Sequence, residues 1–170
     1  MRPETFEALY PVVAGWIQNA LAAHEGKART VASCGFQRLP NYFNAETLTS
    51  SKVVLVDRLP VPPLSAMGLS QFAEFERGDF NGITYLDTFF LKFAFATDES
   101  IHFHELIHVI QWRVLGMKDF LRAYTDGLER FGYRHSPLEK MAYDAEADFS
   151  ASVTFDAEKL VSNALATTSS

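Results

Sequence analysis

Several features that commonly reveal a function are missing from this 170-residue sequence. Cys34 is its single cysteine, which excludes an intramolecular disulfide and a cysteine-based zinc site. No apolar run reaches the roughly 18 residues that a membrane-spanning helix requires, so we expect no membrane partner. The net charge is −6 and no run of Lys or Arg is present, which argues against nucleic acid as a partner.

The N-terminal residues also lack the uninterrupted apolar stretch of a signal peptide, because Glu4, Glu7 and Gln18 break it up. We therefore expect a cytoplasmic protein. Hydrophobic residues make up 48% and charged residues 21%, as in ordinary folded proteins, and the 15 Phe residues indicate an aromatic-rich core or groove. A chain of this length predicts a single domain over residues 1–170.

The pattern of apolar residues predicts an α+β protein. Helical spacing over residues 4–23 indicates an amphipathic helix, and a short β-rich run starts at Ser51. ITYLDTFFLKFAF, residues 83–95, is β-branched and aromatic and is the best strand candidate in the chain. It has two open interpretations: an exposed sheet edge, or a fully buried core strand.

Helix signals dominate the second half of the sequence. Asp98 is placed to cap a helix that ends at Gly116. Ser136 is placed to cap a long C-terminal helix, with Pro137 in the first turn and Glu139 completing a capping box.

HFHELIHVIQW, residues 102–112, carries the most informative motif. On a helix, His104 and His108 lie on one face and can aim their imidazoles at one zinc ion, at about 2.0–2.1 Å each. Glu105 projects from a neighbouring face, where it can take a proton from a zinc-bound water. The HExxH spacing therefore predicts one Zn²⁺ per chain and a catalytic Glu105.

The residues around the motif favour this interpretation over a chance match. Ile101 and Val109 lie four residues before and after Glu105, and an ionised carboxylate in apolar surroundings costs several kcal/mol unless it is paired or near a cation. His102 falls on the other side of the helix and is expected to be exposed or hydrogen-bonded. Gln111 shares a face with His108, and either supports that histidine or is a polar residue ending a buried helix.

A catalytic zinc site needs a third protein ligand. Gln111 and Val114 exclude the HExxHxxGxxH continuation, because they stand where it requires glycine and histidine. The remaining common solution is a carboxylate from a later helix. The candidates are Glu129, Glu139, Asp144, Glu146 and Asp148, with His135 as an outsider.

HELIHVIQW, followed by GYRHSPLEKMAY, resembles a bacterial family of zinc metallopeptidases marked by HExxHVxQ and a downstream NPxExEAY-like element. More distantly the chain is similar to the gluzincins. The resemblance covers residues 83–147 best. It implies a single zincin-like α+β domain with a small sheet, an HExxH active-site helix and a long C-terminal helix.

Carried over by residue, the resemblance makes His104, His108 and Glu139 the zinc ligands and Glu105 the general base. The chain departs from the family pattern at Ser136 and Met141, where asparagine and an acidic residue are usual, and Tyr143 stands where related gluzincins often have an aspartate that supports a histidine.

Glu139 also has a purely structural interpretation, as the glutamate of a capping box. Glu146 lies on the same flank of the expected helix and is the alternative third ligand.

The resemblance implies a zinc-dependent metallopeptidase that acts on a peptide or protein substrate. Four residues lie in the right part of the chain to stabilise its transition state: Tyr124, Tyr133, Arg134 and His135. Each of them also has an interpretation as a surface or packing residue. The alternative is a non-catalytic, zinc-stabilised binding or interaction module. Glu105 separates the two, because a purely structural site has no use for a base.

Overall fold

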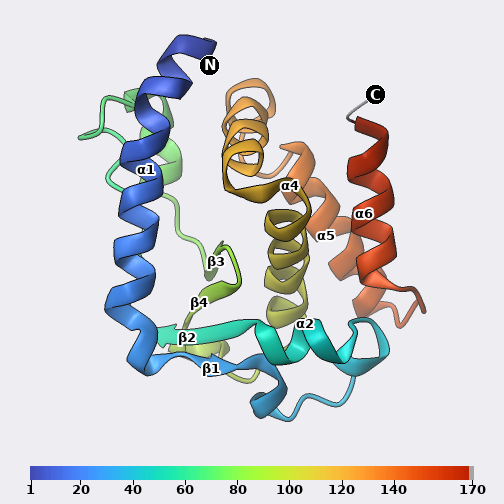
Figure 1. Ribbon diagram of the computed structural model, residues 1–170. Coiled ribbons are helices and arrows are strands. Elements are labelled where there is room, and N and C mark those ends of the chain that lie inside the picture. The colour runs from blue at the N-terminus through green and yellow to red at the C-terminus, as the bar shows by residue number, and fades with distance from the viewer. Residues whose placement is uncertain (169–170) are drawn as a thin grey trace.

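The computed structural model describes residues 1–168 of the chain, which form an α+β protein with a small sheet (Figure 1). The helices are α1 (Pro3–His24), α2 (Ala45–Ser50), α3 (Ala73–Glu76), α4 (Glu99–Phe131), α5 (Pro137–Ser150) and α6 (Ala157–Thr168). The strands are β1 (Arg29–Thr30), β2 (Lys52–Val56), β3 (Gly82–Tyr85) and β4 (Thr88–Lys92). Short 3₁₀ helices cover Glu25–Lys27, Val31–Cys34, Leu39–Asn41, Ser70–Phe72 and Phe93–Phe95.

The sheet has the order β1-β2-β4-β3, with β2 and β4 parallel and the other neighbours antiparallel. The prediction of one strand over residues 83–95 was wrong, because this segment forms the β3–β4 hairpin. Its two-residue turn is Leu86–Asp87, where Leu86 takes a φ of 57° without the glycine or asparagine that usually marks such a turn. Both interpretations of the segment apply in part, since β4 is central and buried whereas β3 is an edge strand.

Helix α4 runs through the middle of the molecule, with α1 on one side and α5 and α6 on the other (Figure 1). Asp98 caps it as expected, by accepting hydrogen bonds from the backbone N–H groups of Ser100 and Ile101. Gly116 breaks the helix at the expected place, with a φ of 73° and a ψ of 165°. Helical residues resume directly afterwards, so α4 consists of two segments joined by a kink.

The predicted long C-terminal helix is two helices, α5 and α6. The chain leaves α5 at Ser152, which has a φ of 59°, and Asp156 starts α6 by accepting a hydrogen bond from the N–H of Lys159. The prediction of a capping box at the start of α5 was also wrong. Ser136 is the N-cap residue and Pro137 lies in the first turn, but within the described chain the Ser136 side chain makes no capping hydrogen bond.

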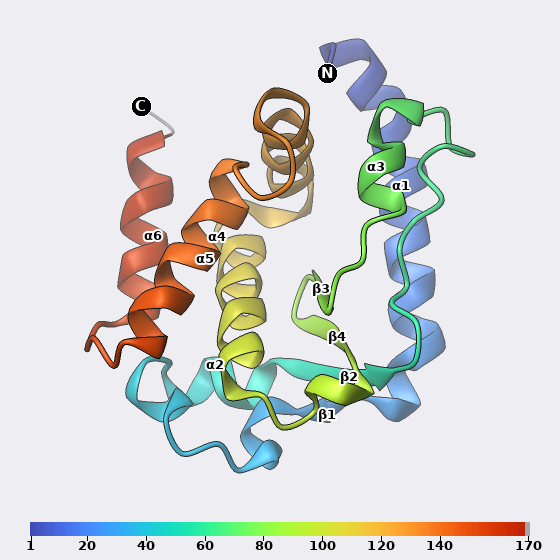
Figure 2. The ribbon, with the colours of Figure 1, turned by 180° about the vertical axis from the view of Figure 1, so that it is seen from behind.

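The main hydrophobic core joins the sheet to α4, α5 and α6. Phe89, Phe90 and Phe103 are fully buried, and Phe103 stacks on Phe149 of α5 with ring centroids 4.5 Å apart. A smaller apolar cluster lies under the segment that includes α3, which rests against α1 (Figure 2). Within residues 1–168, none of the helices has the length and apolar character needed to cross a membrane.

Candidate metal centre

Three buried side chains converge between α4 and α5. His104 and His108 lie one turn apart on the buried face of α4, and Glu139 enters from the first turn of α5. The two Nε2 atoms are 3.2 Å apart, and Oε2 of Glu139 lies 3.6 Å from Nε2 of His104 and 3.5 Å from Nε2 of His108. These three residues form a group that could hold a metal ion.

The spacing of these atoms suits a tetrahedral cation. Two ligand atoms that are each about 2.0–2.1 Å from a tetrahedral ion lie about 3.3 Å apart, close to the three observed separations. Among the described residues, Oε2 of Glu139 has no hydrogen-bond partner although it is buried. A buried carboxylate oxygen without a partner is costly, and a cation between the three atoms would satisfy it.

The outer nitrogen of each histidine has its own oxygen partner. Nδ1 of His104 lies 3.1 Å from Oε2 of Glu146, and Ser100 donates a hydrogen bond to the other oxygen of Glu146. Nδ1 of His108 lies 2.8 Å from Oε1 of Gln111, whose amide group donates to the carbonyl of Leu138. In a neutral imidazole these contacts place the proton on Nδ1, which leaves the Nε2 lone pair for a metal.

The structure therefore separates the two candidates for the third ligand. Glu139 joins the two Nε2 atoms, whereas Glu146 contacts the opposite side of His104. Glu146, and not Tyr143, therefore contacts the outer nitrogen of His104. The ring of Tyr143 instead packs on the His104 ring, with centroids 4.6 Å apart.

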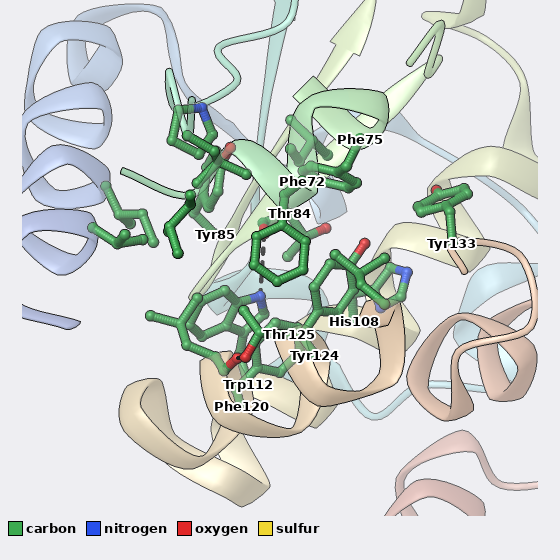
Figure 3. Close-up of a pocket in the computed structure, with 18 of the residues that line it drawn as sticks. Phe72, Phe75, Thr84, Tyr85, His108, Trp112, Phe120, Tyr124, Thr125 and Tyr133 are labelled. Carbon is green, nitrogen blue, oxygen red and sulfur yellow. Dashed lines mark hydrogen bonds between the residues drawn. The ribbon is translucent and has the colours of Figure 1, made fainter. Parts of the chain in front are cut away.

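Glu105 is buried beside the three converging side chains, and residues of the sheet hold its carboxylate in place. The hydroxyl of Thr84, on β3, donates a 2.6 Å hydrogen bond to Oε2 of Glu105. Gly82 lies so close to Oε1 of Glu105 that any Cβ at this position would collide with it. The indole N–H of Trp112 donates to the Thr84 carbonyl and fastens β3 to α4 (Figure 3).

The carboxylates near His104 and His108 favour positive charge between them. Burial lowers the pKa of His104, but the nearby carboxylates of Glu139 and Glu146 outweigh this effect and raise the pKa to about 10. The pKa of Glu105 is raised by burial, although the two histidines oppose the shift. The carboxylates raise the pKa of both histidines, and a divalent ion would supply positive charge at the same place.

The other candidate residues divide between the site and its surroundings. The hydroxyl of Tyr124 donates a 2.6 Å hydrogen bond to Oε1 of Glu139, and Tyr133 lines a cavity that opens beside the site. His135 is exposed and lies outside this cavity. His102 is buried on the far side of α4, where its Nδ1 lies 2.8 Å from the Asp98 carbonyl oxygen, so its hydrogen-bonded interpretation is confirmed.

Gly82, Thr84 and Ser100 contact the site, but the sequence did not predict them as site residues. Thr84 and Gly82 belong to a short strand with no motif of its own, and only the packing of that strand on α4 brings them to Glu105. A glycine inside a run of strand-forming residues was the one available signal, since it often marks a close approach.

An apolar cavity opens beside the site, between the second segment of α4, α1, β3 and the α3 region (Figure 3). Glu105, His108 and Glu139 form part of its lining, and most of the remaining lining is aromatic or aliphatic. The cavity therefore adjoins the candidate metal centre.

No protein-family model, no curated protein and no solved structure matches this chain.

Proposed function

We propose that this protein is a zinc-dependent metallopeptidase with a zincin-like fold. The observation that carries the proposal is the tetrahedral spacing of His104, His108 and Glu139 next to the buried carboxylate of Glu105. Two imidazoles and one carboxylate are the protein ligands of many catalytic zinc sites. When bound, zinc would lower the pKa of a coordinated water and polarise the peptide carbonyl.

The chain's own residues would carry out the proton transfers. Glu105 accepts a proton from the attacking water and passes it to the leaving amine, and burial raises its pKa, which makes it a stronger base. Thr84 holds the Glu105 carboxylate in place, and Glu146 and Gln111 hold the two imidazoles. Tyr133, which lines the adjoining cavity, is the best-placed donor to a developing oxyanion.

The same donor set also binds iron(II), so the first measurement is the metal content of the purified protein. We expect about one zinc ion per chain. His108→Ala should lose the metal, because two ligands do not hold zinc as three do. Full zinc occupancy in this variant would refute the site.

The decisive comparison is Glu105→Gln, which keeps the size of the side chain and removes the proton acceptor. We expect it to retain zinc and to cleave peptides about 10²–10⁴-fold more slowly than the wild type. Glu99→Gln, at the start of the same helix and away from the three ligands, is the matched control. A wild-type protein that binds zinc but cleaves nothing in a broad peptide library would instead be a zinc-stabilised binding module.

A further inference from the structure

We propose that residues 61–80, which connect β2 to β3, form a lid that opens and closes over the metal centre as one unit. The segment contains the 3₁₀ helix Ser70–Phe72 and helix α3. Admission of a substrate by the open lid rests on the proposed function. The movement itself depends only on how the segment is attached to the rest of the chain.

The metal centre is closed in this structure. His104, Glu105, His108 and Glu139 are each at most 6% exposed. A polypeptide cannot bring its backbone to side chains that are covered to this extent, so part of the cover has to move first. Opening of a loop over a closed site is a common way to admit a substrate.

Aromatic rings of the lid close it against the far side of the cavity. Phe80 and Phe75 contact Tyr133, in the connection between α4 and α5, with ring centroids 4.5 and 6.0 Å apart. Phe75 also contacts the ring of Tyr124, which donates its hydroxyl proton to Glu139 (Figure 3). The closed position of the lid is therefore set by a few ring contacts next to the candidate ligands.

The hydrogen bonds of the lid lie almost entirely within it. The N–H of Leu69 donates to the Leu64 carbonyl at 2.8 Å, and the N–H of Ser65 donates to Oε2 of Glu76 at 2.9 Å. Within the described residues 1–168, no backbone hydrogen bond joins residues 61–80 to the rest of the chain. A segment attached in this way opens locally at a much lower free energy than the core.

Both ends of the lid are fixed, which confines the movement to the segment between them. The hydroxyl of Tyr85 donates to the Pro60 carbonyl at 2.8 Å, and the N–H of Lys92 donates to the Asn81 carbonyl at 3.0 Å. Between these points the lid packs on α1 and on the end of α4 through a small cluster separate from the main core (Figure 2). The buried members of that cluster are Leu64, Leu69 and Phe72.

Gly78 offers a way to weaken the closed position without changing the site. A Cβ at Gly78 would collide with the ring of Phe80, so Gly78→Ala has to move this ring away from Tyr133. Phe80→Ala removes the same contact directly. Phe155→Ala is the matched control, because Phe155 is also half-buried but packs on two rings of the main core.

The first test measures the rate constants of zinc uptake and of zinc release to a chromophoric chelator by stopped flow. Gly78→Ala and Phe80→Ala should raise both rate constants by about tenfold, the factor that loss of one or two ring contacts gives. Their ratio, the Kd, should stay within about threefold of the wild-type value, because a lid changes access and not the ligands. Phe155→Ala should leave both rates unchanged. Unchanged rates in both lid variants, or faster release without faster uptake, would overturn the inference.

A second test needs neither metal nor catalysis and follows a thiol placed under the lid. Leu128 packs against the buried side chains of the lid, so Leu128→Cys in a Cys34→Ser background should react slowly with a thiol reagent. Adding Gly78→Ala should speed the reaction by about tenfold, and adding Phe155→Ala should not. Equal reaction rates with and without Gly78→Ala would overturn the lid. If the thiol responds as expected but the protein binds no zinc or cleaves no peptide, the proposed function fails and the lid stands.

Discussion

At the scale of single residues, two glutamates of α5 contact opposite sides of one imidazole of the candidate metal centre. Glu139 lies 3.6 Å from Nε2 of His104, and Glu146, two helical turns later, lies 3.1 Å from its Nδ1. Under the proposed function, the first glutamate is a metal ligand and the second supports a histidine ligand. The same type of residue would then have two roles, set by the nitrogen that it faces.

The two roles predict different losses of metal affinity. Glu146→Gln should weaken zinc binding by about 10–100-fold, the usual effect of losing a group that orients a ligand. Glu139→Gln should weaken it further, because a neutral amide is a poor zinc ligand. Competition with a chelator measures both affinities, and Asp144→Asn on the exposed face of α5 is the control. A larger loss in Glu146→Gln than in Glu139→Gln would exchange the two assignments.

At the scale of elements, the kink in α4 separates the two halves of the site. The segment before Gly116 carries His104, Glu105 and His108, and the segment after it carries Tyr124, which contacts Glu139. The Gly116 backbone, with a φ of 73° and a ψ of 165°, lies in a region that is essentially restricted to glycine. The path of the second segment, and with it the aromatic wall of the cavity, therefore depends on one glycine.

Gly116→Ala should accordingly destabilise the protein by about 1–3 kcal/mol. Gly15→Ala is the matched substitution. It lies inside α1, where a Cβ would meet no atom within 4 Å, and should stabilise the fold by up to about 1 kcal/mol. Urea unfolding of the two variants measures both effects. Equal stability of Gly116→Ala and the wild type would show that residues other than glycine adopt the backbone conformation of the kink without strain.

At the scale of the whole molecule, the carboxylates and histidines of the site make the stability of the metal-free protein depend on pH. The pKa of His104 rises from 6.5 to about 10 on folding, and burial of Glu105 raises its pKa as well. Groups with raised pKa values stabilise the fold at low pH and lose this contribution as the pH rises. Glu139 has a lowered pKa despite its burial, because of His108 and His104, and so loses its contribution as the pH falls below 4.5.

Metal-free protein should therefore lose stability steadily between pH 6.5 and about 10. Zinc should reverse this trend in the neutral range, since the metal competes with protons for the same nitrogens and binds more tightly as the pH rises. Urea unfolding with and without zinc across this range measures both trends. A metal-free protein that became more stable from pH 6.5 to 9 would contradict the charge arrangement described above.

The sequence by itself determined the parts of this protein that depend on local spacing. The positions of His104 and His108 follow from the geometry of one helical turn, and the break at Gly116 follows from a residue that tolerates a positive φ. The buried stripe of α5 likewise follows from helical periodicity, with Leu138 and Phe149 among its residues. These features need no information about distant parts of the chain.

Tertiary structure alone decided which distant groups meet. Glu139 has the sequence signature of a capping residue, but packing of α5 on α4 turns its carboxylate toward the histidines. Thr84 reaches Glu105 only because the hairpin folds against α4, and no local pattern encodes that contact. Long-range packing sets such pairs, since the free energy of burying whole faces of helices and strands exceeds the local preferences of a capping box or a turn.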